Sequence, residues 1–287
     1  MVAPIQTPPA SFAVKVTGSG RPMILIPGLL SSGEVWNDVV SHYQASYECH
    51  VLTLAGFGGV PPTTPTSLAR VRDDVIEYIR VKKLDHPVLV GHSLGGFAAL
   101  WIASAAPDLV GPVVSVDGVP FLPALRDAAA TAEAARPQAE QIRKLYESMT
   151  AEQLAMQSRM AFATMISDPT RVAAATEWAA VSSAPATGAF VAELMTRDIR
   201  ADVARIKVPL LLIGAGKAFA ASPDQLKLAQ QTYEAQVAGV PAHNVIIDEK
   251  ALHFVMFDDL PWLLTTMDGF LKGSGWPAPP GSSVPVR

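Results

Sequence analysis

Short apolar runs alternate along the chain with longer segments in which apolar residues recur every three or four positions. A continuous apolar run is typical of a strand buried on both faces, whereas the wider spacing is typical of an amphipathic helix. Helices that alternate with such strands predict an α/β fold, with a mostly parallel central sheet covered on both faces. The predicted strands are residues 12–16, 22–26, 51–54, 88–90, 113–116, 208–213 and 244–247.

The alternation is interrupted between residues 121 and 200. This segment is rich in alanine, lacks strand patterns and has the spacing of helices. After it the alternation resumes, and helices are predicted at residues 224–237 and 259–271. We therefore expect a core formed by residues 1–120 and 201–287, with residues 121–200 inserted as a helical cap, or lid, over one edge of the sheet.

The segment 87–100, PVLVGHSLGGFAAL, combines a short apolar run, a glycine-rich turn and the start of an apolar helix. Its centre matches the pattern Gly-x-Ser-x-Gly, in which a sharp strand-to-helix turn holds a serine hydroxyl out of the sheet. A serine is a weak nucleophile until a base takes its proton, and this position makes the hydroxyl accessible. Ser93 is therefore predicted to be a nucleophile, because the strand and helix that the motif requires flank it.

A serine nucleophile needs a base, and of the six histidines only His253 lies in a loop after the last predicted strand. That loop has the sequence ALHFVMFD. Loops that follow the carboxyl ends of parallel strands gather at one edge of the sheet. His253 and Ser93 are therefore expected to meet at this edge, with His253 as the general base.

The turn GHSLGG, together with a His-Phe-x-Met-x-Asp run near the end of the chain, resembles the α/β-hydrolase superfamily. The resemblance covers nearly the whole chain. Within the superfamily, the sequence is similar to the esterase-like serine hydrolases that carry a helical lid. A family segment Pro-Gly-Leu corresponds to Pro27-Gly28-Leu29, where many members have His-Gly. The resemblance implies an oxyanion hole formed by the amides of Leu29 and Leu94, which would stabilise the charge that develops in the transition state.

The acid that orients the histidine departs from the commonest family pattern. Most members carry an aspartate shortly after the strand that corresponds to residues 208–213, but here no carboxylate precedes Asp224. Some members place the acid after the strand that follows the nucleophile helix, and Asp117 ends that strand here. Asp117 is therefore predicted as the acid, although Asp-Gly is also a common turn pair. Asp224 is the second candidate, and Asp248, Asp198 or a dyad without an acid are the weaker alternatives.

The resemblance implies acyl transfer to water by a carboxylesterase-like serine hydrolase with the triad Ser93, His253 and Asp117. A serine at the turn argues against dehalogenase or epoxide-hydrolase chemistry, since those members use a carboxylate nucleophile. The apolar cap indicates an uncharged, moderately hydrophobic ester as the small-molecule substrate. Gly28 and Trp36 are expected at its binding pocket, although a position in the core is equally expected for Trp36.

Two other classes of function stay open. The same triad can serve another serine chemistry, such as hydrolysis of a carbon–carbon bond, lactone opening or acyl transfer. Alternatively, the chain is a binding protein that has kept the fold without the activity, and the missing usual acid would be its symptom.

The charge and composition exclude several partners. With 22 basic and 26 acidic residues, a net charge of −4 gives no reason to expect nucleic acid. No apolar run is long enough to span a membrane, and no Cys/His spacing suggests a metal site. Residues 56–59 lack the context of a phosphate-binding loop, so no cofactor is implied.

The two ends of the chain carry little pattern. Residues 1–10 lack the basic start and apolar stretch of a signal peptide, so a cytoplasmic protein is expected, or a periplasmic or secreted one after removal of a signal. The tail from Gly273 is expected to be an irregular extension outside the core.

Overall fold

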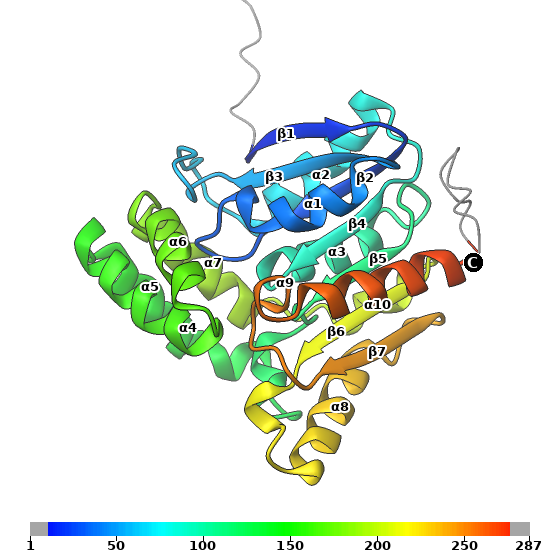
Figure 1. The fold of residues 1–287 in the computed structure, drawn as a ribbon. Helices are drawn as coiled ribbons and strands as arrows, with labels where there is room; N and C mark the ends of the chain where they lie inside the picture. Colours follow the sequence, from blue (N-terminus) through cyan, green and yellow to red (C-terminus); the bar gives the residue numbers. More distant parts are fainter. Residues whose placement is uncertain (1–10, 276–287) are drawn as a thin grey trace, which may run out of the picture.

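The computed structural model describes residues 11–275, which contain a seven-stranded sheet in the order β1-β3-β2-β4-β5-β6-β7 (Figure 1). β1 pairs with β3 in antiparallel orientation, and the other neighbouring strands are parallel. The predicted α/β fold with a mostly parallel sheet is therefore confirmed. The strands are β1 (Phe12–Gly18), β2 (Arg21–Ile26), β3 (Tyr47–Leu54), β4 (Val88–His92), β5 (Val113–Val116), β6 (Leu210–Ala215) and β7 (His243–Asp248).

Helices follow most of the strands and cover both faces of the sheet. The α-helices are α1 (Asn37–Tyr43), α2 (Leu68–Lys82), α3 (Leu94–Ala105), α4 (Ala132–Glu147), α5 (Ala151–Met165), α6 (Pro169–Ala180), α7 (Ala184–Thr196), α8 (Pro223–Val237), α9 (Val255–Asp258) and α10 (Leu260–Gly273). Short 3-10 helices are η1 (Gly33–Trp36), η2 (Leu122–Leu125), η3 (Asp202–Arg205) and η4 (Lys217–Phe219). α1 and α10 lie together on one face, and α2 packs beside α3 on the other (Figure 1).

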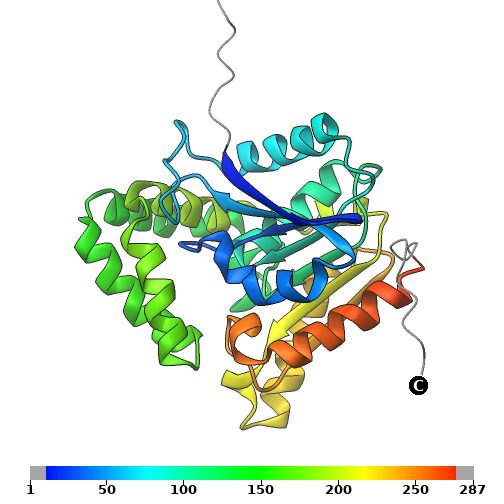
Figure 2. The same cartoon turned by 45° about the horizontal axis from the view of Figure 1, so that its top comes forward.

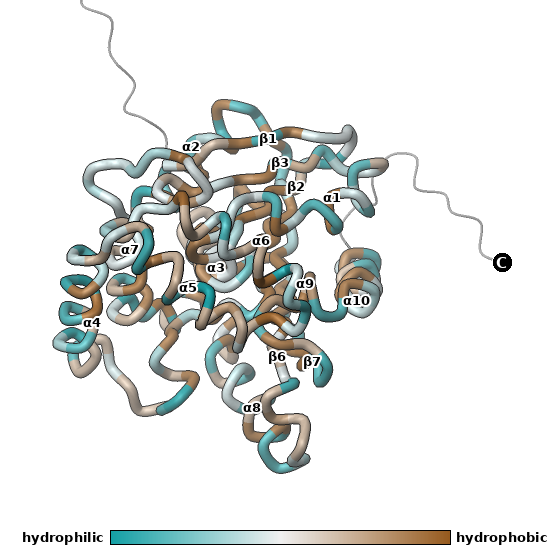
Figure 3. Tube along the Cα trace, turned by 60° about the vertical axis from the view of Figure 1, so that its left-hand side comes forward, coloured by the Kyte–Doolittle hydropathy of each residue, from teal (hydrophilic) through white to brown (hydrophobic). Residues whose placement is uncertain are grey.

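The core lies between the sheet and these helices. The central strands are almost continuously apolar, and residues 23–26 of β2 are completely buried. In Figure 3 these strands are mostly hydrophobic, whereas the outer helices alternate between hydrophilic and hydrophobic positions. Burial on both faces is the reason that the central strands lack the two-residue alternation of a half-exposed strand.

Helices α4 to α7 form a separate group, called the cap below, between β5 and β6 in the chain. They stand beside the edge of the sheet at which the parallel strands end (Figure 2). α4 packs on α7, and α5 packs on α6. Backbone hydrogen bonds join the cap to the core, among them the amide of Ser183 to the carbonyl of Gly56 at 2.7 Å. The division of the chain at residues 120 and 200 stays a prediction.

Two strands, β3 and β6, begin at least two residues away from the predicted start. β3 begins at Tyr47 rather than at residue 51, because its first half is paired with β1. β6 runs from Leu210 to Ala215 rather than from residue 208, since Pro209 has no amide hydrogen for a ladder.

The predictions for residues 1–10 and for most of the tail beyond Gly273 lie outside the described residues. None of the helices in residues 11–275 is both long enough and apolar enough to cross a membrane.

Candidate active site

The predicted nucleophile lies at a sharp turn between a strand and a helix. β4 ends at His92, Ser93 has φ 53° and ψ −117°, and α3 begins at the next residue. The Ser93 amide donates to the carbonyl of Val116 in β5 at 2.9 Å, which fixes the turn to the neighbouring strand. A Cβ on Gly95 would lie 2.1 Å from the carbonyl oxygen of Ile26, so only glycine permits this close approach of the helix to β2.

The predicted acid lies at the end of the next strand. Asp117 follows β5 directly and has φ 51°, which turns the chain and brings its carboxylate toward the loop after β6. Oδ1 accepts hydrogen bonds from the amide of Ala215 at 3.0 Å and from the hydroxyl of Tyr233 at 2.5 Å. Oδ2 lies 2.5 Å from Nδ1 of His253. The carboxylate therefore joins β5, β6, α8 and the loop after β7.

The predicted base is held on two sides. His253 lies between β7 and α9, and its Nδ1 donates to Asp117, which leaves Nε2 for the nucleophile. The backbone carbonyl of His253 accepts a hydrogen bond from Nε2 of His92 at 3.0 Å. The two imidazole rings also pack together, with centroids 4.6 Å apart. Both the backbone and the ring of His253 are thus fixed by groups from β4 and β5.

The surroundings of these residues set their charge. Burial alone would raise the pKa of Asp117, but the hydrogen bond and charge of His253 and the donors Tyr233 and Ala215 hold it below its ordinary value. Burial, and next the neighbouring His253, lower the pKa of His92 to about 3. Burial, and next the charge of Asp117, raise the pKa of Tyr233. At neutral pH, Asp117 is therefore an anion, and His92 and Tyr233 are neutral.

A cavity of about 610 Å³ lies between the core and the cap, and Ser93, Asp117 and His253 all line it. Leu29 and Leu94, the two residues predicted to supply the oxyanion hole, line it as well. Leu94 is the first residue of α3, and amides in the first turn of a helix have no partner within the helix. Most of the other lining side chains are apolar: Leu30, Phe97, Val119, Leu122, Leu125, Phe162, Met165, Val191, Leu194, Phe219, Leu252 and Phe254.

The two residues predicted for substrate binding lie elsewhere. Trp36 is completely buried and is not among the residues that line the cavity, so of the two positions expected for it the structure favours the core. The helical spacing around Trp36 indicates that this face of the segment is buried. The spacing does not distinguish burial in the core from a position at a cavity. Gly28 lies beneath the turn, where a Cβ would be 2.8 Å from Nδ1 of His92 and 3.3 Å from Cβ of Ser93. Gly28 thus makes room for the turn and does not line the cavity.

The alternative acids are not brought to His253. Asp224 is exposed in the first turn of α8, and Asp198 forms an ion pair with Arg200. Asp248 is buried at the end of β7, where it accepts the amide of Lys250, and it does not line the cavity.

Sequence reasoning missed two contacts at the site. Tyr233 falls at an ordinary helical position. The one hint in the sequence is the lack of a carboxylate directly after β6, which indicates that this site departs from the usual pattern. His92 belongs to the turn motif and carries no separate sequence signal, yet its Nε2 donates to the backbone carbonyl of His253. Within the described part of the chain, no three His, Cys, Asp or Glu side chains cluster so that they could hold a metal ion.

The sequence profile of the Alpha/beta hydrolase family matches residues 23–262, so the chain belongs to that family. A pimeloyl-(acyl-carrier protein) methyl ester esterase from Vibrio campbellii is 32% identical over 109 residues, which are 38% of this chain and 41% of that protein. A 2-(acetamidomethylene)succinate hydrolase from Mesorhizobium japonicum is 30% identical over 110 residues, 38% of this chain and 40% of that protein. The chain thus matches about two fifths of the length of these curated relatives.

Solved structures extend the likeness to most of the fold. The enol-lactonase from Burkholderia xenovorans LB400 superimposes with a TM-score of 0.71 at 16% sequence identity. The superposition covers 91% of this chain and 96% of that one. The two proteins therefore share the same overall fold.

Proposed function

We propose that this protein is a serine hydrolase that cleaves carboxylic esters through an acyl-enzyme intermediate on Ser93. The observation that carries the proposal is the hydrogen bond of 2.5 Å between His253 and Asp117 in the cavity that also contains the strained turn at Ser93. A carboxylate–imidazole pair beside an accessible serine is the arrangement that activates a hydroxyl for attack on a carbonyl. The names of the relatives, a methyl ester esterase and a succinate-derivative hydrolase, support the same kind of chemistry.

The reaction proceeds in two halves. His253 takes the proton of Ser93, whose Oγ attacks the ester carbonyl, and Asp117 stabilises the imidazolium that results. The amides of Leu29 and Leu94 receive the oxyanion, and the loss of one such donor costs about 2.7–4 kcal/mol of transition-state stabilisation. His253 then gives its proton to the leaving alcohol and activates a water molecule, which releases the acid and restores Ser93.

The lining of the cavity supports an uncharged, moderately hydrophobic ester. Most of the lining is apolar, and the volume of about 610 Å³ is ample for a small molecule. Polar groups such as those of Gln157 and Thr164 on the cap supply a few hydrogen-bonding positions. Arg126 is the single arginine or lysine in the lining and is exposed, so neutral esters should be preferred over esters that carry a second carboxylate.

The test is hydrolysis of short- and medium-chain nitrophenyl esters by the wild type and by three variants. Ser93→Ala and Asp117→Asn should each lower kcat by about 10⁴-fold or more, because they remove the nucleophile or the correct histidine tautomer. Asp224→Asn should keep full activity, since Asp224 is exposed on α8. A wild type that hydrolyses no ester, or an Asp117→Asn variant that stays active, would contradict the proposal.

A further inference from the structure

The acid in this site is held by a buried tyrosine from α8. The Tyr233 hydroxyl lies 2.5 Å from Oδ1 of Asp117, and the tyrosine side chain is almost completely buried. The other oxygen of the carboxylate, Oδ2, faces His253. One oxygen of Asp117 therefore accepts from the supporting tyrosine, and the other accepts from the histidine. The amide of Ala215 is the second donor to Oδ1.

We propose that Tyr233 is a positioning residue for the reaction, whose hydroxyl fixes the orientation and charge of the Asp117 carboxylate that serves His253. The inference rests on the proposed function, because it assigns Tyr233 a part in the activation of Ser93. It goes beyond the triad, because the Tyr233 hydroxyl donates to Asp117 and is not itself a member of the triad.

The end of β6 leaves room for the tyrosine ring. A Cβ on Gly214 would lie 3.1 Å from Cζ of Tyr233, the ring carbon that carries the hydroxyl. Glycine at this position therefore lets the phenol reach across β6 toward the end of β5. The resemblance noted in the sequence places the usual acid of the family after this strand, whereas here the end of this strand and α8 supply two donors to Asp117, the Ala215 amide and the Tyr233 hydroxyl.

The hydroxyl acts as a donor throughout the accessible pH range. Burial and the charge of Asp117 raise the pKa of Tyr233, so the phenol keeps its proton. Two donors on Oδ1 draw negative charge away from Oδ2 and prevent rotation of the carboxylate. Charge-assisted hydrogen bonds of this kind are stronger than those between neutral groups. Removal of the hydroxyl leaves Asp117 more basic and less well oriented.

The first test compares Tyr233→Phe with the wild type, using nitrophenyl ester hydrolysis and the rate at which a fluorophosphonate labels Ser93. We expect kcat and the labelling rate to fall by about 10-fold, the loss expected for one hydrogen bond to a charged group. KM should change little, because the ring of Tyr233, which lines the cavity, is kept in the variant and only the hydroxyl that donates to Asp117 is removed. The acid limb of the pH profile should move to higher pH, because a more basic Asp117 stabilises the imidazolium of His253 more strongly.

Tyr43→Phe is the matched control. Its hydroxyl also donates to an aspartate, Asp268 at 2.9 Å, and the ring is equally buried, but neither residue lines the cavity. This variant should keep the wild-type pH profile and labelling rate even if its thermal midpoint falls. A change in Tyr43→Phe equal to that in Tyr233→Phe would show that lost stability alone causes the effect and would overturn the inference.

A double-mutant cycle separates action through Asp117 from action on the fold. In an Asp117→Asn background, Tyr233→Phe should have no further effect on labelling, because the carboxylate through which it acts is gone. An additive loss in that background, or a Tyr233→Phe variant within 2-fold of the wild type, would overturn the inference.

Should Tyr233→Phe fail to fold, 3,5-difluorotyrosine at position 233 retains the ring and provides a more acidic donor. The acid limb should then move to lower pH, and an unchanged limb counts against the inference. A wild type that the fluorophosphonate does not label overturns the proposed function, and this inference falls with it. Labelling of the wild type with an unchanged Tyr233→Phe variant overturns the inference alone.

Discussion

Ser93 has a backbone conformation that residues other than glycine rarely adopt. Its φ of 53° with ψ of −117° places it outside the regions open to most L-amino acids. Such a conformation costs about 1–3 kcal/mol and persists because the surrounding chain over-determines it. Here the contacts of Gly95 with β2 and of the Ser93 amide with Val116 do so. The turn exposes the hydroxyl at the expense of stability.

Glycine at position 93 should therefore stabilise the fold while it removes the nucleophile. We expect Ser93→Gly to exceed Ser93→Ala in free energy of unfolding by about 1 kcal/mol, the relief of strain less the greater entropy of glycine in the unfolded chain. Urea denaturation of the two variants measures this difference, and both should be inactive toward esters. Equal stability of the two variants would show that the turn at Ser93 carries no strain.

His92 makes stability depend on pH. Its pKa is lowered to about 3 in the folded protein by burial and by His253, whereas an unfolded histidine titrates near pH 6.5. Between these two values the unfolded state binds one more proton than the folded state. Stability from this group is thus complete above pH 6.5 and is lost as the pH falls, by about 1.4 kcal/mol per pH unit. Below about pH 3 both states are protonated and the loss ends.

The prediction is tested with His92→Gln, which retains a side-chain amide donor for the His253 carbonyl. From pH 6.5 to pH 5.0 the wild type should lose about 2 kcal/mol more than the variant, as measured by urea denaturation. Asp117 and the other histidines are common to both proteins, so the difference isolates His92. Parallel losses in the two proteins would mean that His92 takes up its proton without unfolding.

Two contacts tie the segment that carries His253 to the cap: the amide of Phe254 donates to the carbonyl of Met165 at 3.2 Å, and the carboxylate of Asp258 forms the second tie. Asp258, at the end of α9, accepts hydrogen bonds from the amide of Leu252 at 2.9 Å and from the amide of Ser167 at 2.9 Å. It also accepts the hydroxyl of Ser167 at 2.7 Å. Ser167 lies between α5 and α6, so Asp258 holds both the cap and Leu252, the residue before the proposed base.

Asp258→Ala should release this anchor and lower kcat/KM for esters by about 10-fold, because His253 and the adjacent cap both lose a fixed position. Asp259→Ala is the control, since Asp259 caps α10 by accepting a hydrogen bond from the amide of Trp262. Loss of this cap should lower the free energy of unfolding by about 1 kcal/mol. Esterase assays and thermal midpoints of both variants check the expectation. Equal activity of the two variants would mean that the tie at Asp258 serves stability alone.

The sequence predicts those segments for which the surrounding structure permits a single pattern of residues. Strands buried on both faces must be continuously apolar, and the turn at Ser93 must be flanked by glycine, so both leave a clear signature. Tyr233 leaves none, because it shares one face of α8 with Ala229 and Val237 and has the spacing of a core residue. Trp36 is ambiguous for the same reason. Contacts between distant segments, such as Tyr233 with Asp117, depend on how the elements pack and cannot be read from local spacing.

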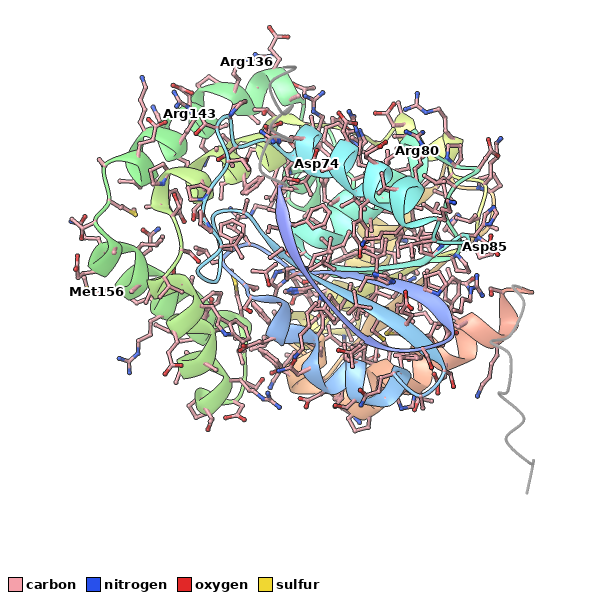
Figure 4. All side chains as sticks on the ribbon, turned by 90° about the horizontal axis from the view of Figure 1, so that it is seen from above. Asp74, Arg80, Asp85, Arg136, Arg143 and Met156 are labelled. Atoms are coloured by element: carbon pink, nitrogen blue, oxygen red, sulfur yellow. The ribbon has the colours of Figure 1, made fainter. Side chains whose placement is uncertain are left out.

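At the scale of the whole molecule, the residues of the candidate site come from segments before and after the cap in the chain. Ser93 and Asp117 precede the cap in the chain and His253 follows it, and the four cap helices stand beside the edge where these residues meet (Figure 2). The outer surface of the cap is not uniformly polar. Met156 on α5 projects outward and is 64% exposed, and Met160 one turn later is 66% exposed (Figure 4). The cap therefore presents apolar side chains both to the cavity and to its surroundings.

Asp117, the proposed acid, follows β5, and this position leaves the loop after β6 open to change. The group that contacts Asp117 from this side is the backbone amide of Ala215, the last residue of β6 before that loop, and every residue except proline supplies such an amide. Ala218 and Phe219 of the same loop line the cavity. Selection, natural or in the laboratory, can thus replace these two side chains to suit new substrates without displacing the acid. In relatives whose acid stands on this loop, every such replacement risks the acid itself.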